Sequence, residues 1–186
     1  MRAIGWLLAL SVAACVSPPP ATITGRTATD AASLVQWSAR GRLGVSAPEQ
    51  SGSGAFVWQQ HADRSEVSLR GPAGLGALNL TLQGATLTLQ AGDGSQYDAD
   101  AAMAELQQRL GVALPMSALP YWLRGLPAPG AYQWRDAAHN QLDQSGWSLL
   151  YDEWNAVNAL RLPLKLTLQR DAVRVIVKVQ SWQADE

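Results

Sequence analysis

Apolar and polar residues alternate along much of the chain, which is the pattern of a β-strand with one buried face. In the segment ALNLTLQGATLTLQ, Leu78 and Leu80 share one face, and Leu87 and Leu89 return to it after a turn at Gly84. The same alternation occurs at residues 41–47, 52–60, 65–71, 130–134, 140–146, 147–154, 162–169 and 172–182. The pattern therefore predicts a mainly β fold, an antiparallel meander of roughly ten short strands.

The last of these segments contains one residue that is out of phase. Val173, Val175, Val177 and Val179 share a face, whereas Trp182 falls on the opposite phase. Because strand side chains alternate strictly, Trp182 is expected at a rim of the sheet.

Three segments have helical rather than strand character. Residues 98–111, DADAAMAELQQRLG, place Met103, Leu106 and Leu110 at helical spacing, and Gly111 is a typical helix stop. Residues 114–130 predict one or two short helical turns, and residues 30–39 predict a short first helix. Two interiors fit this pattern: the helices fill the concave side as an ordinary core, or they only cap it and leave an apolar cavity.

Composition limits the possible partners. The 186 residues carry 14 basic and 15 acidic side chains, a formal net charge of −1, and no charge block along the sequence. Binding to nucleic acid or to an anionic membrane surface is therefore not indicated.

The N-terminus has the layout of an export signal that ends at the only cysteine. Arg2 precedes an apolar run, and the residues before Cys15 read Val12-Ala13-Ala14, which resembles the bacterial lipobox. This resemblance implies cleavage after Ala14 and acylation of Cys15. The alternative is a secreted protein with a chance cysteine in its signal.

The expected organisation is a signal peptide at 1–14, a lipidated N-terminus and tether at 15–29, and one folded domain at 30–186. The tether is rich in Pro, Thr, Ser and Ala, a composition typical of semi-extended linkers. Val16, rather than aspartate, follows the cysteine. By resemblance to lipoprotein sorting rules, that implies a lipid-anchored protein of the outer membrane, on its periplasmic side.

No constellation of residues indicates catalysis, a metal site or a cofactor. His61 and His139 lie in polar segments, and no serine sits in a G-x-S-x-G elbow. Asp93, Asp98 and Asp100 cluster in sequence but miss the calcium-loop pattern. An enzyme is therefore not predicted.

Several motifs in order resemble the family of the outer-membrane lipoprotein receptor LolB. They are Trp37 with SARGRLGV, then SGSGAFVWQQ, LRGPAGLGALNL, LPYWLRGLP, LDQSGWSLLYDEW and the final LPLKLTL and VIVKVQSW. Together they extend from about Trp37 to Trp182. The soluble relative LolA shares the fold but lacks an acylated cysteine, so Cys15 favours the LolB family.

The resemblance implies an unclosed antiparallel β-barrel of about ten to eleven strands, covered by helices and enclosing a hydrophobic cavity. It also implies a monomeric receptor that accepts lipoproteins from LolA and inserts them into outer-membrane phospholipid by non-covalent acyl-chain binding. The alternative is a structural or assembly lipoprotein of the outer membrane, with a filled core and a protein partner.

One loop is assigned to membrane insertion by the resemblance: Gly71, Pro72, Ala73, Gly74 and Leu75. The family has a protruding leucine where this chain has Ala73, so Leu75 is expected to take that role. The alternative is a plain hairpin with Leu75 in the core.

The acyl cavity is expected to be lined by residues of inward strand phase or of the helical cover. Trp58, Trp122 and Trp147 are the tryptophans chosen, because each has apolar neighbours. The full set is Phe56, Trp58, Leu69, Leu78, Leu80, Leu119, Trp122, Leu123 and Trp147.

Overall fold

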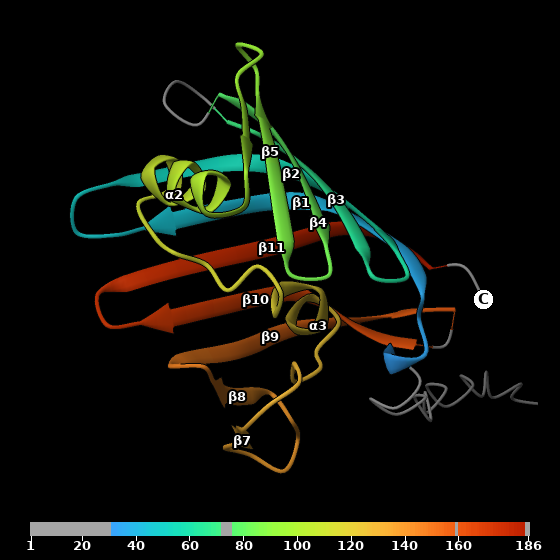
Figure 1. Cartoon of the computed structure of the whole chain (residues 1–186). Coiled ribbons are helices and arrows are strands. Elements are labelled where there is room, and N and C mark those ends of the chain that lie inside the picture. Colours follow the sequence, from blue (N-terminus) through green and yellow to red (C-terminus); the bar gives the residue numbers. More distant parts are fainter. Residues whose placement is uncertain (1–30, 72–75, 159, 185–186) are drawn as a thin grey trace, which may run out of the picture.

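The computed structural model describes residues 31–71, 76–158 and 160–184 and confirms the mainly β fold (Figure 1). Eleven antiparallel strands form one sheet in the order β6-β5-β4-β3-β2-β1-β11-β10-β9-β8-β7. The strands are β1 (Gln36–Ser46), β2 (Ser51–His61), β3 (Arg64–Arg70), β4 (Ala77–Gln83), β5 (Thr86–Ala91), β6 (Gln96–Asp98), β7 (Tyr132–Trp134), β8 (Gln141–Gln144), β9 (Trp147–Val157), β10 (Leu160–Arg170) and β11 (Val173–Ala184).

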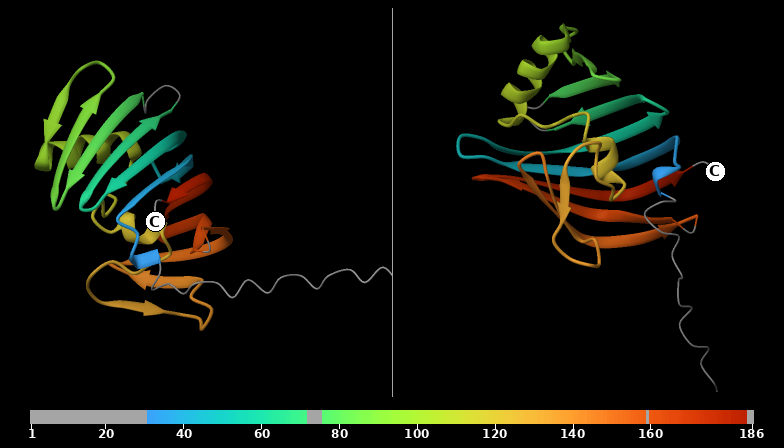
Figure 2. Two further views of the ribbon diagram at one scale, coloured as in Figure 1. Left: turned by 90° about the vertical axis from the view of Figure 1, so that its right-hand side faces the viewer. Right: turned by 60° about the horizontal axis from the view of Figure 1, so that its bottom comes forward.

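The first and last strands meet in the middle of the sheet, where β1 pairs with both β2 and β11. The two edges are the three-residue strands β6 and β7, which pair only on one side, so the barrel stays open. Short edge strands offer few free backbone groups to another chain. Figure 2 shows the sheet curling around the side on which the helices lie.

The helices α2 (Ala99–Leu110) and α3 (Leu119–Leu123) lie on the concave side of the sheet (Figure 1). The helix predicted at 98–111 is confirmed: α2 ends at Gly111, which has a φ of 71° and donates its N–H to the carbonyl of Gln107. A left-handed residue of this kind ends a helix at low cost when it is glycine. We call residues 99–123, which comprise both helices and their connection, the cover.

The helix predicted at 30–39 is wrong. Helical backbone reaches only Ala32 within the described residues, and β1 begins at Gln36. Trp37 and Ala39 are buried on the inner face, with a partly exposed residue between them. Pairing with two neighbouring strands therefore outweighs the weak local helical tendency of this segment.

A β-bulge corrects the prediction made for Trp182. The register between β1 and β11 shifts between Arg40 and Gly41, so Gly41 pairs with Val179 while Arg40 pairs with Ser181. One extra residue on β11 reverses the inward and outward phase of the residues beyond it. Trp182 consequently turns inward and is only 8% exposed, and its indole N–H donates to the carbonyl of Pro163 at 2.8 Å.

Candidate functional site: an apolar cavity under the cover

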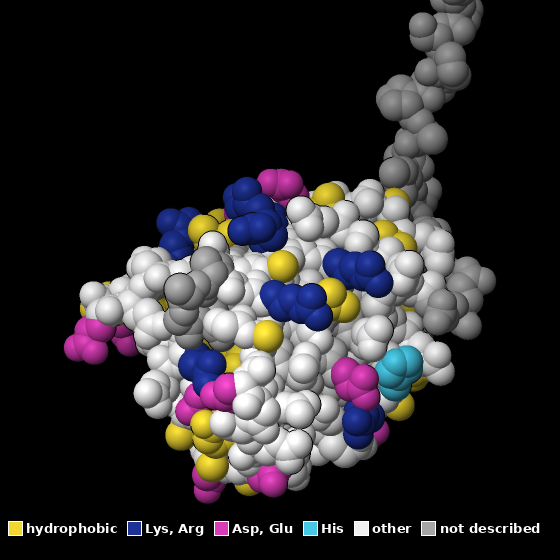
Figure 3. Space-filling view, turned by 90° about the horizontal axis from the view of Figure 1, so that it is seen from above, with side chains coloured by type: hydrophobic (Ala, Val, Ile, Leu, Met, Phe, Trp, Pro, Cys, Tyr) yellow, Lys and Arg dark blue, Asp and Glu magenta, His cyan; other side chains and the backbone are white. Residues whose placement is uncertain are grey.

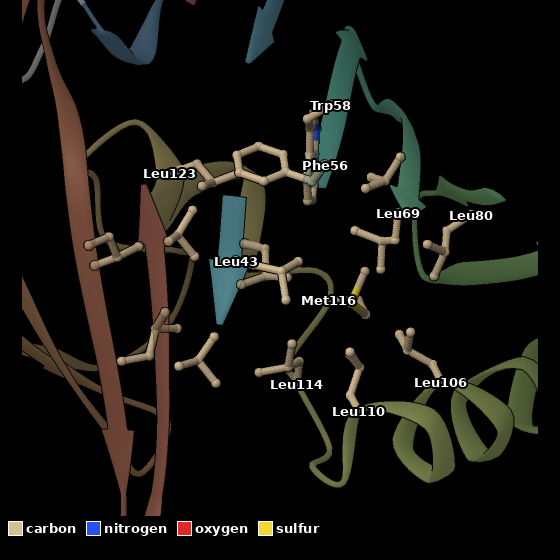
Figure 4. Close-up of a pocket in the computed structure, with 16 residues that line it drawn as sticks. Leu43, Phe56, Trp58, Leu69, Leu80, Leu106, Leu110, Leu114, Met116 and Leu123 are labelled. Atoms are coloured by element: carbon tan, nitrogen blue, oxygen red, sulfur yellow. The ribbon is translucent and has the colours of Figure 1, made fainter. Parts of the chain in front are cut away.

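A cavity of about 70 Å³ lies between the concave face of the sheet and the cover. All of the side chains around it are apolar, and Figure 4 shows those of the sheet and those of the cover converging on one space. The sheet contributes Leu43, Phe56, Trp58, Val67, Leu69, Leu80, Leu166, Leu168, Val175 and Val177, and the cover contributes Leu106, Leu110, Leu114, Met116, Leu119 and Leu123.

Strand register explains the apolar wall. Trp58 lies opposite Val67, which lies opposite Leu80, so β2, β3 and β4 form one continuous apolar row. A second row crosses the middle of the sheet, from Leu43 of β1 to Val177 of β11 and on to Leu166 of β10. Directly opposed side chains on one face touch, so these rows make a closed surface.

Helical spacing explains the other wall. Leu106 and Leu110 of α2, four residues apart, point to the cavity together, as do Leu119 and Leu123 of α3. Between the helices, Leu114 and Met116 fill the middle of the cover (Figure 4). The cover therefore contacts the sheet through apolar side chains that hydrocarbon could replace.

The volume of this cavity sets what it can hold. An apolar cavity of about 150 Å³ is enough for one benzene ring. At about 70 Å³ the cavity is smaller than that, so a long acyl chain does not fit while the cover stays in place. The structure thus has a partly open apolar cavity with little free space.

Several of the residues expected at the cavity line it: Phe56, Trp58, Leu69, Leu80, Leu119 and Leu123. Leu78, Trp122 and Trp147 are buried but do not line it. Trp122 lies on the other side of α3, where its indole N–H donates to Gln144 Oε1 at 2.8 Å. Trp147 begins β9, outside the strands that form the wall, and packs against the guanidinium of Arg170.

The lining residues that the sequence did not single out are aliphatic, apart from Met116. Leu43, Val175 and Val177 already lie on apolar strand faces, and Leu106 and Leu110 on the apolar face of the predicted helix. Periodicity could therefore have found them. The tryptophans were chosen for an inward strand phase or a place on the cover, together with apolar neighbours. These local criteria do not show that Trp147 belongs to a strand outside the cavity wall.

Two other predicted sites fall largely outside the described residues. Cys15 and the segment 72–75, which includes Leu75, are not part of the described structure. Gly71 is described, and its N–H donates to the carbonyl of Gly76 at 3.1 Å. This bond brings together the two ends of the connection between β3 and β4.

Arg124, directly after α3, is a buried charge beside the cover. Its guanidinium donates to the backbone carbonyls of Ala31, Leu34 and Pro120, each at 3.0 Å. Loss of water around it lowers the pKa of Arg124 from its ordinary value, but an arginine remains charged at neutral pH. Arg124 thus links α3 to the segment that leads into β1.

Within the described part of the chain, no group of three or more His, Cys, Asp or Glu side chains is placed to hold a metal ion. Neither described helix has the length or apolar character that crossing a bilayer would require.

An open, curled antiparallel sheet with helices over an apolar cavity on its concave side defines the fold class of this protein, and a solved structure has a similar fold. A LolA superfamily protein from Nitrosomonas europaea matches with a TM-score of 0.51 at 9% identity, over 83% of this chain and 88% of that one. This likeness shows that the two chains share a fold.

Comparison with known sequences identifies the family to which the chain belongs. The family model of the outer membrane lipoprotein LolB matches residues 35–182. The outer-membrane lipoprotein LolB of Pseudomonas putida is 36% identical over 155 residues, which cover 81% of this chain and 76% of the relative. The outer-membrane lipoprotein LolB of Chromohalobacter salexigens is 31% identical over 191 residues, which cover 97% of this chain and 89% of that relative. The chain belongs to the LolB family, as the motifs predicted.

Proposed function

We propose that this protein accepts lipoproteins from a periplasmic carrier of the LolA type and releases their acyl chains into the outer membrane. The observation that supports this most is the purely apolar cavity beneath a cover whose side chains toward it are all apolar. Membership of the LolB family agrees with this role. Binding and release need no covalent chemistry, so the proposed activity is that of a receptor and not of an enzyme.

The hydrophobic effect explains why such a receptor is needed. Each methylene of an acyl chain exposed to water costs about 0.8 kcal/mol, so free passage of lipidated protein through water is strongly unfavourable. An apolar container removes that cost during transfer. Delivery needs no nucleotide if the receiving cavity holds the chains more tightly than the donor does, and the bilayer more tightly still.

Acceptance requires the cover to move, because the cavity of about 70 Å³ has less than half the volume of an apolar cavity, about 150 Å³, that holds one benzene ring. When the cover leaves the sheet, acyl chains take the place of side chains such as Leu106, Leu110 and Leu114. One apolar contact is thereby exchanged for another, so the free-energy cost of opening is largely recovered on binding.

The proposal also includes an anchor and an insertion loop. Acylated Cys15 would hold the domain at the periplasmic face of the outer membrane, and three acyl chains at one cysteine suffice for stable attachment. Leu75 would enter the bilayer during release. The lipobox sequence and the family assignment support the anchor, and the glycine-rich sequence around Leu75 supports an exposed loop.

The test is transfer from a loaded carrier to a soluble chain that begins at Val16 and so retains every described element. This chain should take an acylated lipoprotein from LolA and co-purify with it mole for mole. Leu110→Glu, which puts a carboxylate into the cavity wall, should abolish transfer. Leu150→Glu is the matched control, because Leu150 is 42% exposed and lies away from the cavity.

Refusal of lipoprotein by the unmodified chain would contradict the proposal and favour the alternative, a structural lipoprotein with a filled core. If Leu110→Glu does not fold, uptake of a fluorescent fatty acid by the unmodified chain distinguishes a receptor with an acyl-binding cavity from a structural lipoprotein with a filled core. Leu75→Glu in the anchored protein should leave acceptance intact and slow insertion into the bilayer. An unchanged insertion rate would remove Leu75 from the proposal.

A further inference from the structure

Cations from four strands align on the outer face of the sheet. Arg42 of β1 lies directly opposite Lys178 of β11, which lies opposite Lys165 of β10. On the other side, Arg42 is opposite Ala55 of β2, and Ala55 is opposite Arg70 of β3. We call Arg42, Arg70, Lys165 and Lys178 the basic row. With strands about 4.8 Å apart, it extends over about 19 Å.

Most of this charge is not neutralised by the protein. Strands β1, β2 and β11 contain no Asp or Glu. In the row, only Lys165 has an ion-pair partner among the described residues, Asp152 at 3.0 Å. Arg42, Arg70 and Lys178 are exposed, and no carboxylate of the described chain lies within ion-pair distance of them. Arg40, two residues from Arg42, adds another exposed cation.

The register makes this arrangement unfavourable for the isolated fold. Like charges directly opposite each other across two strands destabilise a sheet, and Arg42 with Lys178 is such a pair. An anionic partner would remove that repulsion. Figure 3 shows Lys and Arg across the middle of one face, with most Asp and Glu nearer its edge.

We propose that the basic row docks the outer face of the sheet on the anionic phospholipid headgroups of the membrane. The inference rests on the proposed function, because a receptor that releases acyl chains must sit close to the bilayer. Arg70 immediately precedes the connection to which that function assigns membrane contact. The row therefore fixes which side of the domain faces the lipid.

The composition of this face favours headgroups over a protein partner. Stable protein interfaces have an apolar, fully buried centre with a polar rim. The large exposed apolar side chains of the described chain are Val35, Tyr132 and Leu150, and none of them lies on β1, β2, β3 or β11. A row of long cations without an apolar centre suits a charged surface such as that of an anionic bilayer.

The experiment is co-sedimentation of the soluble chain from Val16 with phospholipid vesicles. Vesicles that contain phosphatidylglycerol should bind it, vesicles of phosphatidylcholine alone should not, and added salt should weaken binding. The double variant Arg42→Gln with Lys178→Gln should bind on the order of tenfold more weakly.

The matched control is Arg64→Gln with Arg135→Gln, which loses the same net charge but removes cations already paired with Glu66 and Asp143. This control should bind like the unmodified chain. Equal loss in both variants would show an effect of total charge and overturn the proposal. So would equal binding to both kinds of vesicle, or a loss of carrier binding with no effect on vesicles.

Failure of this proposal is distinguishable from failure of the proposed function. The variant Arg42→Gln with Lys178→Gln leaves the cavity untouched, so it should accept lipoprotein from the carrier like the unmodified chain. If neither chain accepts lipoprotein, the proposed function fails, whatever the vesicles show.

Discussion

The guanidinium of Arg124 lies over the indole ring of Trp37, with its central carbon 5.8 Å from the ring centroid. Trp37 in turn stacks on Trp58, whose ring borders the cavity, at a centroid distance of 6.1 Å. The start of β1, the end of α3 and the cavity wall are thus connected through three packed side chains. A buried cation holds one end of the cover against the sheet.

Replacing Arg124 by methionine should destabilise the protein by about 3 kcal/mol. Methionine keeps much of the apolar stem, but the three backbone carbonyls that Arg124 now satisfies would lose a charged donor. Urea unfolding followed by tryptophan fluorescence measures the change. Arg135→Met is the control: Arg135 is an exposed member of a surface ion pair, so a change within about 1 kcal/mol is expected. Equal stability of both variants would contradict the role of Arg124.

Gly41→Ala should destabilise the sheet by about 2 kcal/mol or more. A Cβ at this position would collide with the carbonyl oxygen of Lys178 and come within 2.9 Å of the Phe56 ring. Gly52, in the neighbouring strand, has nothing within 4 Å of the same position, so Gly52→Ala should be neutral or slightly stabilising. Thermal unfolding of the two variants makes the comparison, and similar melting temperatures would refute it.

Tyr151→Phe should raise the free energy of unfolding by about 1 kcal/mol. The Tyr151 hydroxyl is buried and has no hydrogen-bond partner in the described structure, so the native state bears its desolvation cost. Burial also raises the pKa of Tyr151 above its ordinary value, so this phenol is neutral near pH 7, as an exposed tyrosine is. Urea unfolding tests this, with the exposed Tyr132→Phe expected to change stability little. A loss of stability in Tyr151→Phe would reveal a partner that the hydroxyl needs.

A disulfide between positions 50 and 111 should lock the cover and stop acyl uptake. Gln50 already donates to the carbonyl of Arg109 at 2.6 Å, and a Cβ on Gly111 would lie 3.0 Å from that of Gln50. Disulfides need about 3.5–4.5 Å between these atoms, so a shift of about 0.5 Å is required. In a chain that begins at Val16 no other cysteine competes.

The effect of this disulfide is tested by measuring the uptake of a fluorescent fatty acid by the double variant Gln50→Cys with Gly111→Cys. The oxidised protein should take up none, and reduction should restore uptake. Gly111→Cys alone controls for the left-handed backbone at this position, which costs a non-glycine residue about 1–2 kcal/mol. Normal uptake by the oxidised protein would mean that opening does not involve this end of α2.

The local pattern of apolar and polar residues predicted much of the fold and part of the cavity lining. Strand alternation identified the face that carries Phe56 and Leu69, and helical spacing identified Leu106 and Leu110 as one side of a helix. Prediction from the local pattern failed where strand pairing decides which way a side chain points or whether a segment is helix or strand. A bulge in the pairing of β1 with β11 turned Trp182 inward, and pairing made a strand of the residues around Trp37.

The grouping of charges on the outer face also depends on strand pairing. Read along the chain, the basic residues form no block, which argued against an anionic membrane surface. The sheet brings Arg42 and Lys178 face to face because the first and last strands pair. Proximity across a sheet depends on topology, which a search for charge runs cannot detect.

By itself, the amino-acid sequence determined most of the strands, the main helix and the family, because these follow from local periodicity and from ordered motifs. Only the tertiary structure decided which apolar residues meet at the cavity, that the space beneath the cover is about 70 Å³, and that four cations share one row. The physical reason is that a cavity and a surface are made by residues far apart along the chain, and register and packing alone bring them together.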